Sequence, residues 1–367
     1  MESMCTDVVR WAENGEHRRA RWRSGSGAPA PRRVAVADDR TSADAALRLA
    51  RKGTALLWRG DFHNGRRLLQ ALGRRLPRAK ADGFEQHRRQ QARRARVLGM
   101  LLVPFDAGHV IPLRRAPDVR TACAEVYGPS NEPYLLPLRE LLGLVGAHEW
   151  RRKGIEITRI GRIHPHYGVF APTRGEYVDL IAETPLPTTG IAFDIGTGTG
   201  VLAAILARRG VRRVVATDHD PRALTCARDN IARLGLSARI EVLRADLFPP
   251  GRADLVVCNP PWIPARPTSR LEHAVYDPES RMLRGFLSGL ADHLAPGGEG
   301  WLILSDLAEH LGLRSRTELL GMIASAGLRV VGRVDARPTH RRAHDATDPL
   351  HSARAAEVTS LWRLAVR

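Results

Sequence analysis

The chain has 367 residues, of which 43% are hydrophobic and 26% are charged, so it can hold more than one domain and bury a sizeable core. It contains no apolar run of about 18 residues, the length of a membrane-spanning helix, and its N-terminus carries no apolar stretch of the signal-peptide type. We therefore expect a cytoplasmic protein without membrane contact. The cysteines, Cys5, Cys123, Cys226 and Cys258, are too widely spread to indicate a metal site or a disulfide framework.

The formal net charge is +18, and the basic residues are nearly all arginine. An arginine-rich solvated surface would account for this excess, and so would a polyanionic partner such as ribosomal or transfer RNA. The clustering of arginines before Trp150 favours contact between the N-terminal region and nucleic acid. The clusters are Arg18-Arg19-Ala20-Arg21, Arg74-Arg75, Arg88-Arg89 and Arg93-Arg94-Ala95-Arg96.

Two segments precede residue 151. Residues 1–33 end in a Ser/Gly/Ala/Pro/Arg stretch that can bury little apolar surface, so we predict a flexible Arg-rich tail. Residues 34–150 are predicted to form a mainly helical accessory domain, with substrate recognition as its candidate role. Leucine spacing predicts helical structure over 41–76, with a turn at 61–65, and a helix over 133–150. Two apolar runs around a turn predict a β-hairpin over 98–113.

Apolar runs and amphipathic stretches alternate over residues 151–367. Such alternation requires right-handed crossovers and a mostly parallel sheet with helices on both faces, which is the α/β class. The predicted strands are 155–163, 191–193, 214–217, 240–243, 255–258, 301–304, 329–334 and 358–366.

A glycine-rich turn follows the strand at 191–193 and contains Asp194, Gly196, Thr197, Gly198 and Gly200. Glycines between a buried strand and a helix allow a sharp turn and the close approach of a ligand. The spacing differs from the Gly-x-Gly-x-x-Gly of dinucleotide-binding proteins, because valine stands where the last glycine would be. The Asp194 carboxylate would repel a diphosphate and attract the positive amino-acid end of a sulfonium cofactor. The turn therefore favours a sulfonium cofactor over NAD.

Two later carboxylates are candidate cofactor ligands. Asp218 lies at the end of the strand predicted over 214–217, where it could accept hydrogen bonds from both ribose hydroxyls. The alternative is a strand-end cap, for which Asp220 is the better candidate. Asp246 follows the strand predicted over 240–243 and could accept a hydrogen bond from an adenine amino group, or be an ordinary turn residue.

The strand at 255–258 delivers Asn259-Pro260-Pro261-Trp262 at its carboxyl end, the edge at which open parallel sheets bind ligands. A planar amide or aryl amine is a poor nucleophile because its lone pair is delocalised. The Asn259 side-chain oxygen and the Pro260 carbonyl can accept its two N–H groups and localise that lone pair. Prolines stiffen the loop, and Trp262 offers a face for stacking. The motif predicts N-methyl transfer with Asn259, Pro260 and Trp262 as catalytic residues; a proline-rich turn without function is the alternative.

The segment from about Gly154 to Val334 resembles the class I S-adenosylmethionine-dependent methyltransferases of the small-domain group, especially the HemK-like protein N5-glutamine methyltransferases. The resemblance implies a Rossmann-like, doubly wound sheet of seven strands and S-adenosylmethionine as cofactor. It rests on 194–200, 216–218, 245–248 and 259–264. The cofactor-binding residues expected from the turn, the later carboxylates and these motifs together are Asp194, Gly196, Thr197, Gly198, Gly200, Asp218, Asp246 and Asn259.

The chain departs from the HemK-like pattern at several points. Trp262 stands where those enzymes usually have tyrosine, and residues 167–177 match only loosely a Pro-Arg-Pro-Glu-Thr-like segment, in which Pro172 and Glu176 would cap the cofactor pocket. An Arg/His-rich segment, 337–354, interrupts the end of the fold.

These features leave four functions open. The first is methylation of a glutamine amide in a protein of the translation machinery, favoured by Ile263-Pro264. The second is methylation of a base nitrogen in RNA or DNA, adenine N6 or guanine N2, favoured by Trp262 and the arginine clusters. The third is a catalytically silent RNA- or partner-binding module, against which the complete motif set argues. The fourth is an NAD-dependent oxidoreductase.

Overall fold

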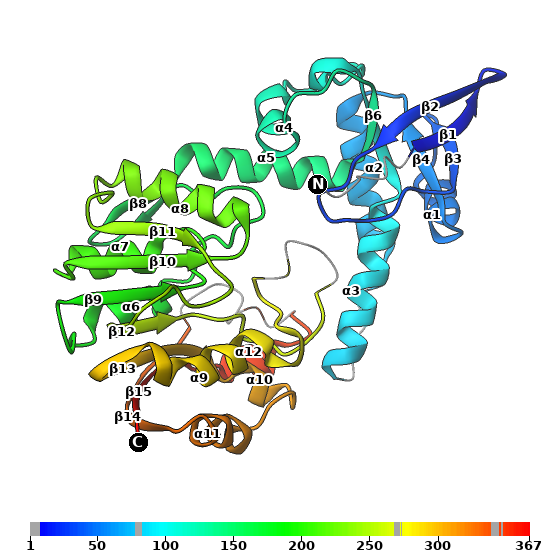
Figure 1. Cartoon of the computed structure of the whole chain (residues 1–367). Helices are drawn as coiled ribbons and strands as arrows, with labels where there is room; N and C mark the ends of the chain where they lie inside the picture. Colours follow the sequence, from blue (N-terminus) through cyan, green and yellow to red (C-terminus); the bar gives the residue numbers. More distant parts are fainter. Residues whose placement is uncertain (1–7, 78–82, 268–271, 273, 339–344, 346–347) are drawn as a thin grey trace. The chain divides into compact units, whose positions relative to one another are not determined.

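The computed structural model describes residues 8–77, 83–267, 272, 274–338, 345 and 348–367. The chain divides into two compact units, Met1–Glu149 and Trp150–Arg367, which we call the N-terminal and C-terminal units. Each has its own main sheet (Figure 1). Within the described ranges, no helix combines the length and the apolar character needed to span a bilayer, and no three His, Cys, Asp or Glu side chains are grouped to hold a metal ion.

The N-terminal unit contains a six-stranded sheet, which corrects the expectation of a mainly helical domain. Segments such as 55–58 and 101–103 are short, continuous apolar runs that are fully buried. Burial on both faces removes the alternation by which a strand is recognised. In spatial order the strands are β1 (Val8–Glu13), β2 (Glu16–Trp22), β6 (Tyr134–Pro137), β5 (Leu101–Phe105), β4 (Thr54–Trp58) and β3 (Arg33–Ala37).

The helices of this unit differ in part from those predicted. Strand β4 interrupts the helical structure predicted over 41–76, and β6 replaces the start of the helix predicted over 133–150. The hairpin predicted over 98–113 does not form, because β5 pairs with β4 and β6 instead. The helices are α1 (Ala43–Arg51), α2 (Phe62–Arg75), α3 (Phe84–Leu98), α4 (Arg120–Tyr127), α5 (Leu138–Lys153) and the single turn η1 (Ala107–His109).

The described part of the predicted flexible tail is ordered. Strands β1 and β2 form a hairpin whose turn, Asn14-Gly15, has positive φ at both residues, as a tight hairpin favours. The stretch that follows is held by Glu140 of α5: Ser24 and Ser26 donate to its Oε2 at 3.1 and 3.3 Å. Hydrogen bonds to Glu140 therefore order a stretch that has few apolar contacts to offer. Residues 1–7 lie outside the described residues.

The C-terminal unit contains the predicted Rossmann-like sheet of seven strands. The first five strands in spatial order are parallel to their neighbours, and β15 runs antiparallel to both β13 and β14. The α/β, doubly wound class is thus confirmed. The spatial order is β11 (Ile240–Arg244), β10 (Arg213–Asp218), β9 (Ile191–Ile195), β12 (Ala253–Cys258), β13 (Leu294–Ser305), β15 (Thr359–Val366) and β14 (Leu328–Ala336).

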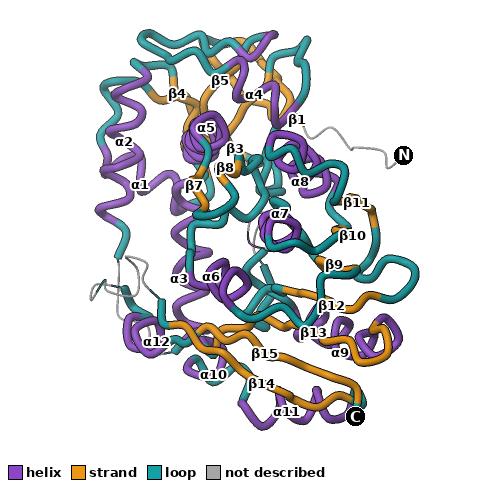
Figure 2. Tube along the Cα trace, turned by 90° about the vertical axis from the view of Figure 1, so that its left-hand side faces the viewer, coloured by secondary structure: helices purple, strands orange, loops and turns teal. Residues whose placement is uncertain are grey.

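Helices cover both faces of this sheet. Figure 2 shows α6 (Glu176–Glu183), α7 (Val201–Arg208) and α8 (Pro221–Arg233) on one face. The opposite face carries α9 (Arg281–His293) and α11 (Arg316–Ser325). Successive strand residues alternate between the two cores: Ala192 packs with the first set of helices and Phe193 with the second. Because both faces are buried, the strands are continuous apolar runs in the sequence.

Smaller elements complete the unit. The strand predicted over 155–163 is instead an antiparallel pair, β7 (Ile155–Ile157) and β8 (Gly161–Ile163), because the chain turns at Arg159, which has a φ of 76°. The other short elements are η3 (Pro278–Ser280), α10 (Leu307–His310) and α12 (His351–Ala356). Of the Arg/His-rich segment 337–354, residues 339–344 and 346–347 lie outside the described residues.

Candidate functional site

The glycine-rich turn and the Asn-Pro-Pro-Trp motif leave the sheet at adjacent strand ends. Strand β12 pairs with β9 with Cys258 opposite Ile195, so Asn259 and Gly196 are the next residues along these two strands. Strand β10 lies on the other side of β9, with Thr217 opposite Ile195. The carboxyl ends of the three central strands therefore bring together the segments that the sequence analysis singled out.

The turn after β9 needs glycine for its conformation. Gly196, Gly198 and Gly200 have φ values of 71°, 55° and 82°, in the left-handed region that other residues seldom adopt. Thr197 ties the turn to β10 by donating its backbone N–H to the Thr217 carbonyl at 2.8 Å. A Cβ atom added to Gly198 would have no neighbour within 4 Å. The backbone at Gly198 is consequently open to a ligand.

Asp194 lies beneath this turn and is 1% exposed. Its Oδ2 accepts hydrogen bonds from the Thr197 hydroxyl at 2.6 Å and from the Ala203 backbone N–H at 3.1 Å. Burial raises the pKa of this carboxyl group to about 6. In the structure Asp194 holds the turn together, and its direct contact with a cofactor stays a prediction.

Asp218 links the end of β10 to the same turn. One carboxylate oxygen accepts from the Gly198 N–H at 3.1 Å and the other from the Asp220 N–H at 2.9 Å. Asp220 caps α8, since its side chain accepts from the Arg222 N–H, as the sequence analysis expected. Burial raises the pKa of Asp218. The capping role therefore belongs to Asp220, while Asp218 faces the glycine turn.

Asp246 is the most exposed of the predicted cofactor ligands. It follows β11 at the same edge of the sheet, its side chain is 77% exposed, and Arg281 lies 3.5 Å from its Oδ2. A weak surface ion pair of this kind leaves the carboxylate accessible.

In the Asn-Pro-Pro-Trp loop, the last residue is hydrogen-bonded to the first. The indole Nε1 of Trp262 donates to Asn259 Oδ1 at 2.8 Å, and Asn259 is half-buried whereas Pro260 is buried. The buried Arg314 holds the loop from behind, because its guanidinium donates to the Trp262 carbonyl at 3.4 Å and to the Ser280 hydroxyl at 3.3 Å.

Two residues beside this loop escaped the sequence analysis. The Arg174 guanidinium lies 5.2 Å from the centroid of the Trp262 ring, a cation–π distance. It also donates to Glu357 Oε1 at 2.7 Å, and the same oxygen accepts from the Ser305 hydroxyl at 2.7 Å. No local signal identifies this pair, because Arg174 and Glu357 are 183 residues apart in the chain.

Several buried oxygens near Arg174 and Glu357 have no hydrogen-bond partner. Glu176 is 5% exposed, yet neither of its carboxylate oxygens accepts a hydrogen bond from another residue. The Oε2 of Glu357 and the hydroxyl of Thr359 are also buried without partners. Burial raises the pKa of Glu176, although the Arg174 guanidinium, 4.0 Å from its Oε1, acts to lower it. Since orphaned buried acceptors are costly, the arrangement fits a ligand that supplies N–H donors or positive charge.

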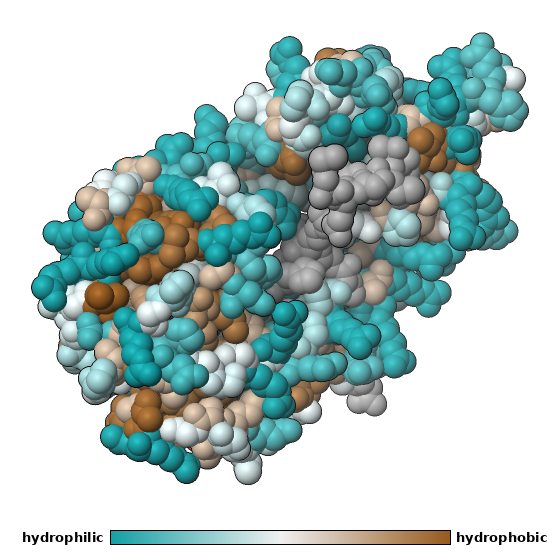
Figure 3. All heavy atoms as spheres, in the orientation of Figure 1, coloured by the Kyte–Doolittle hydropathy of each residue, from teal (hydrophilic) through white to brown (hydrophobic). Residues whose placement is uncertain are grey.

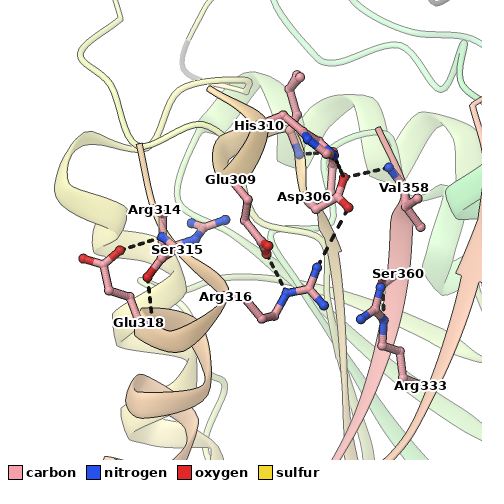
Figure 4. Close-up of polar contacts among 12 residues, drawn as sticks. Asp306, Glu309, His310, Arg314, Ser315, Arg316, Glu318, Arg333, Val358 and Ser360 are labelled. Carbon is pink, nitrogen blue, oxygen red and sulfur yellow. Dashed lines mark hydrogen bonds and ion pairs between the residues drawn. The ribbon is translucent and has the colours of Figure 1, made fainter. Parts of the chain in front are cut away.

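A polar network fixes the segment that carries Glu357 and Thr359. Figure 4 shows Asp306, at the end of β13, accepting from the Val358 N–H at 2.7 Å. Arg316 is held in turn by Glu309, with Nε 2.7 Å from Oε1. The start of β15 is thereby tied to the end of β13 at the edge where the motif residues lie.

Comparison with known families bears on this geometry. Residues 161–317 match the family model described as "Methyltransferase small domain". The matched segment contains the glycine turn, Asp218, Asp246 and the Asn-Pro-Pro-Trp motif, so the resemblance inferred from those motifs is confirmed for this part of the chain.

The chain is also similar to curated proteins. A release factor glutamine methyltransferase of Cereibacter sphaeroides is 36% identical over 170 residues, covering 44% of this chain and 57% of the relative. One from Moorella thermoacetica is 41% identical over 115 residues, 30% of this chain and 41% of the relative. A ribosomal protein L11 methyltransferase of Pelotomaculum thermopropionicum is 33% identical over 193 residues, 50% of this chain and 59% of the relative. The chain therefore spans between 41% and 59% of the length of these relatives.

Proposed function

We propose that this protein is an S-adenosylmethionine-dependent N-methyltransferase that acts on a side-chain amide of glutamine in a translation-related protein. The observation that carries the proposal is the pairing of Cys258 with Ile195. This register sets a two-acceptor motif beside an open glycine turn at the carboxyl edge of the sheet.

The residues present fit S-adenosylmethionine, which supplies an electrophilic methyl group when bound. The open backbone at Gly198 would admit its amino-acid portion. The Glu176 carboxylate, which accepts no hydrogen bond and has only a 4.0 Å ion pair with Arg174, would suit the ammonium group. Asp218 would accept from the ribose hydroxyls, and the accessible Asp246 from the adenine amino group. Asp194 supports the turn from below, through Thr197.

The protein's chemical task is to make a planar nitrogen nucleophilic. The Oδ1 of Asn259 and the carbonyl of Pro260 would each accept one N–H of the substrate amide, which weakens conjugation and exposes the nitrogen lone pair. With the cofactor bound, these two acceptors would hold the nitrogen lone pair toward the methyl group that the cofactor supplies, and the nitrogen would lose its proton after transfer. Fixed positioning can lower such a barrier by about 7 kcal/mol or more.

Two relatives support a translation-related protein as the substrate, since a release factor and a ribosomal protein appear in their names. The names of the first two specify glutamine. A base nitrogen in RNA or DNA is the second candidate, because the Asn259 and Pro260 acceptors suit an exocyclic amine equally well. Trp262, in place of the tyrosine usual in HemK-like enzymes, gives that candidate a larger stacking surface.

A label-transfer experiment tests the proposal. The purified protein is incubated with methyl-labelled S-adenosylmethionine and separate protein, RNA and DNA fractions of a lysate, with Asn259→Ala as the matched control. We expect label in protein, and N5-methylglutamine after digestion of the labelled product. Label in RNA or DNA would instead identify a base nitrogen as the methylated atom. Binding of the cofactor with no transfer to any fraction would support the catalytically silent module instead.

A further inference from the structure

The positive charge of the chain is concentrated in one short region. Residues 51–100 contain 14 Lys and Arg and only 3 Asp and Glu, an excess of 11 out of a net charge of +18. This region includes the end of α1, β4, α2 and α3. More than half of the net charge is therefore concentrated in this one region of the N-terminal unit.

Helix α3 shows that this region exposes polar surface. Phe84 and Val97 are its only described buried residues, and Figure 3 shows a largely hydrophilic surface over it. Arg94 attaches α3 to the end of α2, where it donates to the Gly73 and Leu76 carbonyls at 2.6 and 3.1 Å. The two helices thus form one basic surface.

A hollow of about 430 Å³ opens beside α2 in the same unit, lined by His63, Arg66, Arg67, Gln70 and Arg115. We call it the α2 hollow. Every one of these side chains is polar, and three of them carry a guanidinium group. Within the described part of the chain, neither Arg66 nor Arg67 has an ion-pair partner. Their charges are therefore available to an external anion.

The remaining arginine of the hollow is held in position by a buried carboxylate. Asp61 is 1% exposed, and its Oδ2 accepts from Arg115 Nε at 2.6 Å and from Arg114 Nε at 3.1 Å. The hydrogen bond from Arg115 keeps the pKa of Asp61 well below its usual range. Asp61 accepts a hydrogen bond from Nε of Arg115. The terminal amino groups of that guanidinium remain able to donate hydrogen bonds to an anion.

The same loop is fixed by the backbone. Phe62, the first residue of α2, donates its N–H to the Arg114 carbonyl at 3.0 Å, and Arg115 adopts a φ of 58°, a left-handed conformation uncommon outside glycine. The nearest other carboxylate, Asp39, accepts from the Asp61 N–H and the Asn64 side chain. Arg115 is thus fixed in position on one side of the hollow.

We propose that the α2 hollow binds phosphate groups of single-stranded RNA. Guanidinium groups match phosphate in geometry and charge, and Gln70 and His63 add hydrogen-bonding capacity. An acidic protein partner would be anchored by apolar or aromatic contacts, which this lining does not offer. Duplex DNA is stiff over roughly 150 base pairs and cannot bend into so small a concavity, whereas a single strand can. This binding does not depend on the methyl-transfer activity proposed above.

The test compares two double variants of the full-length protein in fluorescence anisotropy with a labelled oligouridylate. Arg66→Gln/Arg67→Gln removes two charges from the hollow. The control, Arg10→Gln/Arg19→Gln, removes two exposed charges that face each other across the β1–β2 hairpin of the same unit. We expect the first variant to bind about tenfold more weakly and its salt dependence to fall by about 0.7 per lost phosphate contact. The control should stay within about twofold of the wild type.

Three results would overturn the proposal. Equal losses in both variants would mean that only total charge matters. Competition by polyglutamate as effective as that by unlabelled oligouridylate would indicate an acidic polypeptide ligand. Binding of duplex DNA as tight as that of the single strand would contradict the fit to a flexible strand. Thermal unfolding of each variant checks that both remain folded.

Discussion

The indole Nε1 of Trp262 donates to Asn259 Oδ1 at 2.8 Å. This bond occupies one of the two lone pairs of the predicted acceptor oxygen. A carboxamide can rotate by half a turn and exchange its oxygen and nitrogen. The indole bond selects one orientation, in which Oδ1 keeps a second lone pair for a substrate N–H. A tryptophan at this position therefore does more than provide a stacking face.

Replacement of Trp262 by phenylalanine should separate these two contributions. The phenyl ring keeps an aromatic face for Arg174 and for a substrate, but it has no N–H donor. We expect kcat to fall about tenfold, the equivalent of one ordinary hydrogen bond, with cofactor affinity within twofold. Trp150→Phe is the control, since Trp150 is 50% exposed. An unchanged kcat in Trp262→Phe would show that the indole bond does not orient Asn259.

Removal of the acceptor itself gives the strongest expected effect. Asn259→Ala should abolish methyl transfer, because it deletes the side-chain oxygen proposed to localise the substrate lone pair. Cofactor affinity, measured by calorimetry, should stay within a few-fold, since the glycine turn and Asp218 are unchanged. A fully active Asn259→Ala protein would falsify the acceptor role.

How much could be predicted from sequence depends on the range of the interactions. The strand–turn–helix at 191–208 and the motif at 259–262 are local, so residue order alone located them. Arg174 and Glu357 are 183 residues apart and meet only because the fold brings their segments together. The loose match at 167–177 does not indicate this pairing. Strands β4 and β6 of the N-terminal sheet were missed because they are short and buried on both faces, which leaves no alternation to detect.

Glu176 is predicted to lower stability and favour cofactor binding at the same time. Its buried carboxylate accepts no hydrogen bond and has only a 4.0 Å ion pair with Arg174. Such a group destabilises the free protein, while it would attract the cofactor's ammonium group. Glu176→Gln should therefore raise the thermal midpoint without cofactor and weaken cofactor binding about tenfold. Glu183→Gln, at the exposed end of the same helix, should change neither quantity. A fall in both stability and affinity would indicate a purely structural role.

Asp218 joins the glycine turn to the proposed ribose position, so its substitution tests two contacts. Asp218→Ala leaves the Gly198 N–H without its acceptor and the ribose hydroxyls unpaired. We expect cofactor affinity to fall by about 1–3 kcal/mol, the cost of unsatisfied hydrogen-bonding groups. Asp220→Ala removes the neighbouring helix cap and should reduce stability with little effect on affinity. Unchanged affinity in Asp218→Ala would restrict Asp218 to a structural link between β10 and the turn.

The buried Asp194 is expected to make the folding stability of the protein depend on pH. Its pKa rises from the ordinary value of 3.8 to about 6 on folding, so between these values the folded state binds more protons than the unfolded chain. Stability should therefore fall as pH rises through this window, and the full penalty is present above it. The substitution Asp194→Asn removes the charge but keeps a side-chain oxygen that can accept from Thr197 and Ala203. It should consequently stabilise the protein at pH 8 by on the order of 2–3 kcal/mol, and this difference should vanish below about pH 4, where the wild-type acid is protonated in both states.

Urea denaturation of the wild type and of Asp194→Asn between pH 4 and pH 8 measures this difference directly. Asp220→Asn supplies a control of opposite sign: although burial acts to raise the pKa of Asp220, its hydrogen bonds with Arg222 lower that pKa overall, so the charged form stabilises the fold and its loss should destabilise the protein at pH 8. If Asp194→Asn were less stable than the wild type at pH 8, the ionised carboxylate would be the form that the glycine turn requires. The ionised Asp194 carboxylate would then stabilise the glycine turn, in spite of the burial that raises its pKa.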